Sequence, residues 1–448
     1  MIKCLEFSSL YPVLRLKRLN RIASEGALKP VKKIKVIHLF FPVLLSVVFF
    51  PIQLIKTFFV AKGSVYLWTY NINRFEHNGR EINKFYEPLK NSAHKLYNFE
   101  RGLPSRLHIS ASELDTTPLE YFSVIFAKIG TFIISSKAKT LMKQLFSSYG
   151  TELSEEEIFY LYRFVYLEYF LRCYFYLKRP KLCVVTNWYG LRGLAVVVAC
   201  RNLDIVCADY QHGLAAASNH RAYTDLVFYR DYEKFLPNYF LTWTRTDSMA
   251  IDNQGVFDIV KSYEIGIPWV DYISAMDIKT KERTLTDDAD KPSLGPSTIL
   301  YIAGVEVEEW FIQFLKKRRY NEKSRVLIKQ HPSYPISTEI LELIERYASG
   351  VELIVSHSLA EILLSCDLVL GEWSGGLLEA NYLGKSTIVV GTKGHMLLSG
   401  YSGLFFVSEQ EVVDNSFDLE QYVSKCKNYV VHDDIAAKFD CWVANATI

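Results

Sequence analysis

Residues Asp367-Leu-Val-Leu-Gly-Glu-Trp-Ser-Gly-Gly-Leu-Leu-Glu-Ala380 decide the fold of this 448-residue chain. An apolar segment, typical of a buried strand, runs into a Ser-Gly-Gly turn, and the turn begins a helical pattern that carries Glu379. Glycines let a backbone approach an anion closely, and a helix start offers unpaired N–H groups and the positive end of its dipole. A carboxylate one turn into the helix can accept hydrogen bonds from ribose hydroxyls. The stretch therefore predicts a strand, a turn and a helix that bind a nucleotide.

Strand and helix patterns alternate around this stretch. Strand composition is found at 182–186, 204–208, 239–243, 298–302, 326–329, 351–355, 368–370 and 386–390. Helical patterns separate these segments at 191–202, 306–319, 338–348, 359–365 and 376–383. Such alternation predicts parallel sheets with right-handed crossovers, and hence a doubly wound α/β architecture.

The length of the chain predicts two domains, because one core rarely serves so many residues. A polar stretch with Pro and Gly at 280–297 is typical of an inter-domain linker. The first strand composition appears at Ser64–Tyr70. We therefore expect an N-terminal segment 1–62, a first domain 63–279, the linker 280–297 and a second domain 298–448.

Composition excludes some classes of function. The formal net charge of +2 argues against the gross basicity of a nucleic-acid-binding protein. The eight cysteines lie in mostly apolar segments without a CxxC pair, which predicts reduced, buried thiols. Asp288 and Asp290 have the spacing of a metal-binding pair but lie in the polar linker, so we expect neither an obligatory metal nor a resident cofactor.

The N-terminal segment combines basic residues with an apolar run, Val36–Ile55, that is about as long as a membrane-spanning helix. Pro42 and Pro51 would each remove a backbone hydrogen bond, and His38 and Gln53 are poor lipid neighbours. Two short helices in the interface of an anionic membrane fit this pattern better, while a buried hairpin and a true span are the alternatives. A signal peptide is not expected, because the run starts late and no small-residue cleavage site follows it.

Polar motifs follow the predicted strands, and ligands of open parallel sheets bind outside the carboxyl ends of strands. We therefore expect these motifs to form the functional site. The candidates for nucleotide binding are Gly304, Lys329, His331, Pro332, Glu372, Ser374, Gly375, Gly376 and Glu379, and those on the opposite side are Tyr189, Gly190, Gln211 and Gly213.

Two histidines and an aspartate are the candidate catalytic residues. His331 either caps a strand or donates a hydrogen bond or charge to a phosphate, and Lys329 would point the same way along the strand unless it is simply solvated. His212 precedes Gly213, which allows a sharp turn, so His212 could act as a general base or merely pack. Asp209 could orient His212, serve as the base instead, or pack in the core.

Ser374 is interpreted as a phosphate donor at a helix start. The sequence around it lacks the GxSxG elbow of a nucleophilic serine.

Four short motifs carry a resemblance to a known family: Gln211-His212-Gly213 with a following His220 and Tyr223, then Glu264-Ile-Gly-Ile-Pro268, Gln330-His331-Pro332 and Glu372-Trp-Ser-Gly375. They resemble motifs of bacterial glycosyltransferases that build capsule, lipopolysaccharide and teichoic acid. The chain is most similar to the group that contains polysialyltransferases, Kdo-transferring capsule enzymes and CDP-glycerol glycerophosphotransferases. The resemblance covers about residues 180–395, and it implies the GT-B fold, in which two Rossmann-like domains face a cleft.

The resemblance also implies roles for particular residues. By this likeness His331 contacts the donor phosphate, Ser374 matches the first serine of a Ser-Ser or Ser-Thr motif, and His212 lies at the active-site cleft. Gly375 replaces the second hydroxyl residue, and Glu372-Trp373 replaces the more usual Asp-Tyr. The base of the donor nucleotide, whether of CMP, CDP, UDP or GDP, is therefore left open.

The expected function is transfer of a sugar from a nucleotide-sugar donor to a glycan or lipid-linked acceptor in bacterial surface polysaccharide biosynthesis. We expect an inverting, metal-independent reaction, with the acceptor on the first domain and the nucleotide on the second. The expected location is the cytoplasmic face of the inner membrane, peripheral or re-entrant. The alternatives are a polyol-phosphate transferase, a sugar-nucleotide 2-epimerase and a non-catalytic GT-B scaffold.

Overall fold

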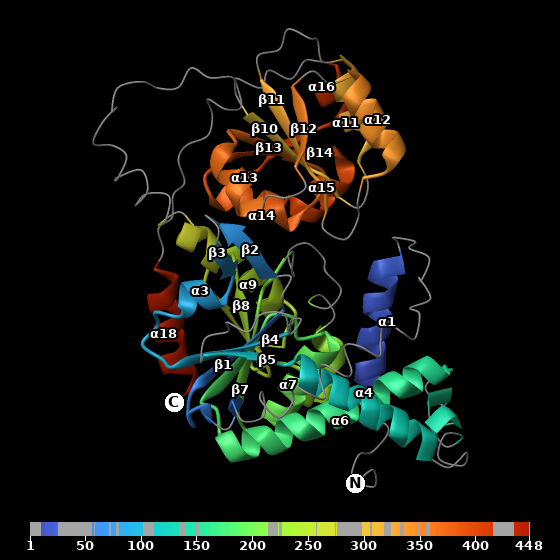
Figure 1. Ribbon diagram of the computed structural model, residues 1–448, viewed down its shortest axis with the longest axis vertical. Helices are drawn as coiled ribbons and strands as arrows, with labels where there is room; N and C mark the ends of the chain where they lie inside the picture. The colour runs from blue at the N-terminus through green and yellow to red at the C-terminus, as the bar shows by residue number, and fades with distance from the viewer. Residues whose placement is uncertain are drawn as a thin grey trace.

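Two α/β domains lie one above the other in the computed structural model of this chain (Figure 1). The linker expected at 280–297 and the apolar run 36–55 fall outside the described residues. The structure describes residues 10–25, 56–57, 59–70, 73–77, 80–101, 112–133, 140, 142–144, 146–147, 150, 152–213, 223, 226–256, 258–273, 275, 298–304, 307–317, 324–331, 336–347, 350–354, 359–414 and 434–447.

The first domain is built on a seven-stranded parallel sheet in the order β5-β4-β1-β6-β7-β8-β9. The chain runs outward from β1 to β5, then returns to β6 and runs outward on the other side, so the winding reverses between β1 and β6. The strands are β1 (Val65–Tyr70), β4 (Leu96–Arg101), β5 (Glu113–Asp115), β6 (Leu182–Val185), β7 (Val206–Tyr210), β8 (Tyr239–Thr242) and β9 (Lys261–Glu264).

The second domain has a six-stranded parallel sheet in the order β12-β11-β10-β13-β14-β15, with its reversal between β10 and β13. The five strands predicted here are confirmed, and β15 is an addition that the sequence did not indicate. The strands are β10 (Thr298–Ile302), β11 (Arg325–Lys329), β12 (Val351–Ile354), β13 (Leu368–Gly371), β14 (Ser386–Val390) and β15 (Phe405–Val407).

Helices cover both faces of each sheet, which explains why the central strands are apolar along their whole length. In the first domain they are α1 (Tyr11–Glu25), α3 (Tyr86–Leu89), α4 (Thr117–Ile133), α6 (Glu155–Lys178), α7 (Leu191–Arg201), the 3-10 segment η5 (Leu226–Phe235) and α9 (Arg245–Asp252), beside the small antiparallel pair β2 (Arg74–His77) and β3 (Arg80–Asn83). In the second they are α11 (Glu309–Lys317), α12 (Thr338–Tyr347), α13 (Leu359–Ser365), α14 (Gly375–Tyr382), α15 (Gly391–Leu398) and α16 (Glu409–Val413).

Alternate residues of β1 point into different cores. Tyr66 and Trp68 pack with α6 and α7, whereas Val65 and Leu67 join a second apolar cluster on the other face of the sheet. That second cluster continues through Trp269 into the second domain, where it includes residues of β10, β13 and α14. One apolar core is therefore shared between the two domains.

The C-terminal helix α18 (Ile435–Ala446) lies on the first domain, next to α3 (Figure 1). Its Trp442 ring packs against Tyr239 of β8, with 5.6 Å between ring centroids. The Asp440 carboxylate accepts a hydrogen bond from the Ala93 backbone at 2.8 Å. The sequence division at 298–448 assigned this segment to the second domain, but its apolar face is buried against the first.

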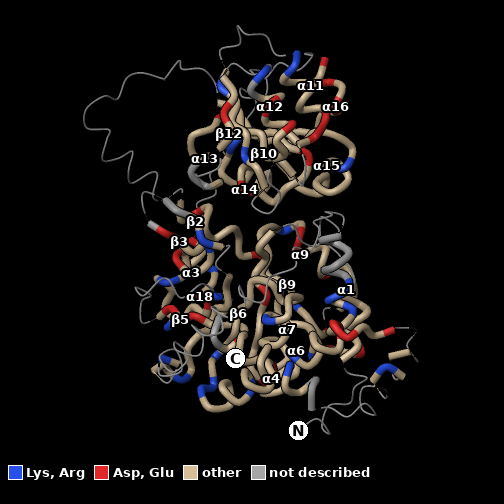
Figure 2. The backbone as a smooth tube through the Cα atoms, turned by 45° about the vertical axis from the view of Figure 1, so that its right-hand side comes forward, with Lys and Arg blue, Asp and Glu red and all other residues tan. Residues whose placement is uncertain are grey.

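Helix α1 is part of the first domain. Leu10, Val13 and Leu14 are buried in its core. Lys17 and Arg18 form ion pairs with two glutamates of α6, at 2.9 and 2.7 Å, so protein carboxylates neutralise these cations. Basic and acidic residues are interspersed over both domains (Figure 2). Within the described part of the chain, no helix has the length and apolar character needed to cross a membrane.

Candidate active site

The polar motifs of the second domain lie at the carboxyl ends of three adjacent strands. Lys329 is paired with Ile302, and its carbonyl accepts a hydrogen bond from Ala303 at 3.0 Å, so the loops after β11 and β10 start side by side. The loop after β13 lies next to them across the reversal point. The structure thus brings Gly304, Lys329, His331, Glu372 and Ser374 to one edge of the sheet, whereas Pro332 is outside the described residues.

Ser374 is the N-cap of α14. Its Oγ accepts a hydrogen bond from the Gly376 amide at 3.1 Å. A Cβ on Gly376 would lie 2.8 Å from Leu359 Cδ2 and 3.0 Å from Ile302 Cδ1. Close packing of α14 on its neighbours is therefore sufficient reason for a glycine at 376, a position that sequence reasoning linked to an approaching anion.

Glu379 joins the two domains. The side chain is only 9% exposed, its carboxylate accepts a hydrogen bond from Trp269 Nε1 at 2.9 Å, and Lys84 Nζ lies 3.5 Å away. Both partners belong to the first domain. In this arrangement the carboxylate is used for an inter-domain contact, although the sequence suggested a contact with ribose.

Glu308 and Trp373 lie next to Gly304 at the reversal point, and Lys393 lies over Trp373. A Cβ on Gly304 would lie 3.1 Å from Glu308 Oε1 and 3.5 Å from Trp373 Nε1. Lys393 Nζ lies 4.3 Å from the centroid of the Trp373 ring. The sequence pointed to Trp373 only as part of the Glu372-Trp-Ser-Gly375 motif, and it did not indicate Glu308 or Lys393. These two lie in segments that follow β10 and β14, a weak signal without knowledge of the strand order.

The environment of Glu308 raises the pKa of its carboxyl group to about 7. Burial is the largest cause and the Glu372 carboxylate adds to it, while hydrogen bonds from backbone N–H groups and the Lys393 ammonium oppose it. Burial raises the pKa of Glu372 as well. This edge of the site therefore holds a carboxyl group that can both give and accept a proton near neutral pH.

The raised pKa predicts a pH effect on stability. The Glu308 carboxyl group binds its proton more tightly in the folded state than in the unfolded state, where its pKa is near 4.5. The contribution of Glu308 to stability is therefore fully present below about pH 4.5 and is lost as the pH rises to about 7. Glu308→Gln should become more stable relative to wild type by roughly 2 kcal/mol between pH 5 and pH 8, as measured by urea unfolding. A difference that does not change with pH would contradict this.

The histidine turn of the first domain follows β7, next to the loop that follows β6. Tyr189 OH lies 3.4 Å from His212 Nε2. The Asn187 side chain accepts a hydrogen bond from the Gly190 amide at 2.9 Å, which shapes the start of α7. Tyr189, Gly190, His212 and the neighbouring Gly213 thus lie together at the carboxyl ends of two adjacent strands.

Asp209 is completely buried at the end of β7. Its carboxylate accepts hydrogen bonds from the Trp188 amide at 2.9 Å and from Tyr223 OH at 2.7 Å. Burial raises the pKa of Asp209 to about 7, and these two hydrogen bonds oppose the rise. Among its alternatives, this geometry favours a positioning role, because Asp209 ties the loop after β6 to Tyr223.

A chain of buried hydrogen bonds connects the histidine turn to the second domain. Gln211 Nε2 donates to the Gly213 carbonyl at 2.9 Å and to Asp247 Oδ2 at 3.1 Å, so this side chain spans His212. Asp247 Oδ1 accepts a hydrogen bond from Tyr401 OH of the second domain at 2.8 Å. Gln211 therefore acts as a support for the turn that carries His212.

Removing the Tyr401 hydroxyl should test this connection. Tyr401→Phe leaves the buried Asp247 carboxylate with fewer donors, so the free energy of unfolding should fall by about 1–2 kcal/mol. Thr246→Val is the matched control, because it removes the exposed inter-domain hydrogen bond from Thr246 to Gly400, 3.2 Å long. Urea unfolding of both variants is the measurement, and an equal loss in the two would contradict the connection.

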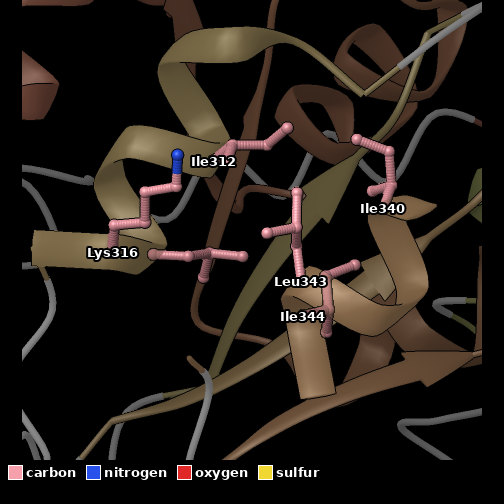
Figure 3. Close-up of a pocket in the computed structure, with 6 residues that line it drawn as sticks. Ile312, Lys316, Ile340, Leu343 and Ile344 are labelled. Carbon is pink, nitrogen blue, oxygen red and sulfur yellow. The ribbon is translucent and has the colours of Figure 1, made fainter. Parts of the chain in front are cut away.

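A surface pocket of about 210 Å³, open solvent included, lies between α11 and α12 (Figure 3). Five of its six lining side chains are apolar, and the sixth belongs to Lys316. All six come from these two helices and none from the strand-end loops. The pocket lacks the several convergent polar groups that orient a substrate.

Among the described residues, no cluster of three or more His, Cys, Asp or Glu side chains is arranged to hold a metal ion. Asp288 and Asp290 are not among the described residues.

Comparisons with known proteins place the fold. Neither a protein-family model nor a curated protein matches this sequence. A solved UDP-N-acetylglucosamine 2-epimerase superposes with a TM-score of 0.52 at 13% identity, covering 86% of this chain and 96% of its own. The corresponding epimerase of Neisseria meningitidis has a TM-score of 0.49 at 13% identity, covering 85% of this chain and 100% of its own. The wall teichoic acid polymerase TagF has a TM-score of 0.43 at 12% identity, covering 91% of this chain and 94% of its own.

The chain therefore has the two-domain GT-B fold, as its motifs implied. At these identities the likeness shows the fold alone, and a fold does not specify a reaction.

Proposed function

We propose that this protein is a glycosyltransferase that moves a sugar from a nucleotide-sugar donor to a glycan or lipid-linked acceptor in bacterial surface polysaccharide assembly. One observation carries the proposal. Two parallel sheets present polar motifs at the carboxyl ends of their strands, with a histidine turn on one and a serine-capped helix on the other. That pairing suits an acceptor on the first domain and a nucleotide on the second.

The donor side supplies groups for a diphosphate. The start of α14 offers backbone N–H groups and a positive dipole end. Lys329 is the last residue of β11, two strands away from β13 in the sheet, and His331 lies two residues beyond it. As the bond from the anomeric carbon to the donor phosphate breaks, these groups stabilise the charge that collects on the departing nucleotide.

The acceptor side supplies the base. A ring nitrogen of His212 removes the proton from the acceptor hydroxyl, and the resulting oxygen nucleophile attacks the anomeric carbon opposite the leaving phosphate. One displacement inverts the configuration at that carbon. Tyr189 fixes the position of the His212 ring, and Asp209 and Gln211 hold the loops on either side.

A sugar-nucleotide 2-epimerase is the second candidate. The specific observation in its favour is the pair of carboxyl groups of Glu308 and Glu372, because proton removal and return at a sugar carbon needs a group that titrates near neutral pH. The solved epimerase with the same fold acts on UDP-N-acetylglucosamine, and this chain would then act on a related donor.

Attachment to the cytoplasmic face of the inner membrane, peripheral or re-entrant, belongs to the same proposal. It rests on the basic residues of the N-terminal segment other than Lys17 and Arg18, which are paired with glutamates of α6, and on the apolar run Val36–Ile55. A lipid-linked acceptor would be presented at that surface.

A double-label experiment separates the candidate reactions. The full chain is incubated with nucleotide sugars labelled both in the sugar and in the phosphorus next to it, with and without a lipid-linked oligosaccharide. Sugar label alone on the acceptor supports glycosyl transfer, whereas both labels indicate transfer of a sugar phosphate. A polyol-phosphate transferase is indicated if CDP-glycerol, labelled in its glycerol and in the phosphorus next to it and tested in parallel, delivers both labels to the acceptor. An altered sugar without acceptor indicates an epimerase, and no change with any donor indicates a scaffold.

A further inference from the structure

We propose that Arg101, Arg163 and Arg192, grouped around Glu120, form a binding site for an acidic group of the acceptor, a phosphate or a carboxylate. We call these four residues the arginine cluster. The assignment of this acidic group to an acceptor rests on the proposed function, whereas the binding of an anion does not.

The arginine cluster lies at the carboxyl edge of the first sheet. Arg101 is the last residue of β4, Glu120 is in the first turn of α4, Arg163 is on α6 and Arg192 is the second residue of α7. The Glu120 carboxylate is buried, with Arg101 Nε and Arg163 Nη2 both 3.3 Å and Arg192 Nε 3.8 Å away. Four separate elements therefore converge on one point.

Within the arginine cluster positive charge exceeds negative charge, because three guanidinium groups face the single carboxylate of Glu120. The nearby Glu100 and Glu113 are paired with a fourth arginine, Arg74, at 2.5 and 2.7 Å. With these residues and the buried Asp115 at the end of β5 included, four arginines balance four carboxylates, so the excess is confined to the groups around Glu120. The first turn of α7, which carries Arg192, adds the positive end of a helix dipole.

The arginine cluster also has donors to spare. Arg163 Nε is buried and has no hydrogen-bond partner in the part of the chain that the structure describes, and a buried donor of this kind is costly to leave unsatisfied. The Arg101 side chain is 53% exposed, so its guanidinium group is accessible to solvent. An anion held between them would accept a hydrogen bond from Arg163 Nε and pair with the accessible Arg101 guanidinium.

Arg192 holds the arginine cluster in place. Its side chain is 4% exposed, donates to Thr116 Oγ1 at 2.8 Å and to the Thr69 carbonyl, and lies 4.0 Å from the centroid of the Tyr70 ring. These contacts link α7 to the ends of β1 and β5 and fix the guanidinium geometry before an anion binds. Such preorganisation lowers the entropic cost of binding.

The arginine cluster shares its sheet edge with the histidine turn. In the strand order, β4 is separated from β7 by β1 and β6, so the two sites are about three strand spacings apart, roughly 14 Å. An acceptor whose hydroxyl lies at His212 would therefore place a neighbouring sugar residue or a lipid-linked phosphate on the arginine cluster. The acidic group belongs to the acceptor chain and not to the hydroxyl-bearing sugar that reacts.

Arginine determines the class of ligand. Its planar fork matches the two oxygens of a carboxylate or phosphate, which a neutral sugar lacks. A neutral glycan would gain nothing from this charge.

The test is calorimetric titration of the full chain with inorganic phosphate, with glucuronic acid and with neutral glucose. Arg101→Gln removes the accessible cation. Arg230→Gln is the matched control, because Arg230 is 56% exposed and paired with Asp258 at 2.9 Å, away from this edge. Circular dichroism confirms that both variants are folded.

We expect at least one of the two anions to bind wild type and Arg230→Gln equally, and to bind Arg101→Gln about tenfold more weakly. The tighter anion identifies the source as a phosphate or a sugar carboxylate. Equal affinity in all three proteins, no anion binding to wild type, or equal binding of glucose would overturn the proposal. Because no turnover is measured, these outcomes do not depend on the proposed transferase activity.

Discussion

Replacing His212 by alanine is expected to lower the rate of sugar transfer by about 10²- to 10⁴-fold, the usual contribution of a general base. Nucleotide affinity should not change, because His212 lies on the first domain and the nucleotide motifs lie on the second. Single-turnover kinetics with saturating donor measures the effect.

Tyr189→Phe is the control for this result. It removes only the hydroxyl that lies 3.4 Å from His212 Nε2, so the imidazole is kept and the loss should be much smaller. Unchanged transfer in His212→Ala would remove His212 from the mechanism.

Replacing Gly394 by alanine should displace the backbone of the loop after β13 and so disrupt the proposed nucleotide site of the second domain. A Cβ at this position of α15 would lie 2.0 Å from the Glu372 carbonyl oxygen and 2.5 Å from Val389 Cγ1, so the loop after β13 must move. We expect a loss of about 3 kcal/mol in the free energy of unfolding, together with weaker nucleotide binding. Urea unfolding and calorimetric titration with the nucleotide measure the two effects.

Gly400→Ala is the control, because the nearest atom to its Cβ is Thr246 Cγ2 at 3.4 Å, an ordinary contact. Equal stability of Gly394→Ala and Gly400→Ala would contradict the close contact between Gly394 of α15 and the Glu372 carbonyl group. In the first domain, Gly193 of α7 likewise allows a close approach to the preceding loop, because a Cβ at this position would lie 1.9 Å from the Asn187 carbonyl oxygen.

The sequence predicted the second domain well, because its strands are short apolar runs bounded by polar turns. The predicted bounds of β10, β14 and α13 agree with the structure. The local apolar pattern is sufficient where a strand is buried on both faces.

The first domain was harder to predict because polar residues are buried inside its strands. The sequence of β4 is Leu-Tyr-Asn-Phe-Glu-Arg. Its Asn98 and Glu100 side chains are buried, and they accept hydrogen bonds from Thr69 and Arg74, respectively. β9 is an edge strand without an apolar run. Neither pattern resembles a strand until its partners are known.

Long-range pairing explains the remaining differences. Lys17 and Arg18 meet their glutamates 139 residues away in the chain, so the sequence could not show that these cations are neutralised. Glu379 meets Trp269 and Lys84 only because the two domains are packed together. Polar residues at strand ends were located correctly, but their individual contacts depend on how the domains meet.

In the proposed function, the second domain binds the nucleotide of a sugar donor. A thermal-shift panel of CMP, CDP, UDP and GDP tests it most directly, since a ligand that binds only the folded state raises the melting temperature. We expect one nucleotide to stabilise wild type and His212→Ala equally, and this stabilisation to be lost in His331→Ala. No stabilisation by any of the four, or a shift that is lost in His212→Ala and kept in His331→Ala, would contradict it.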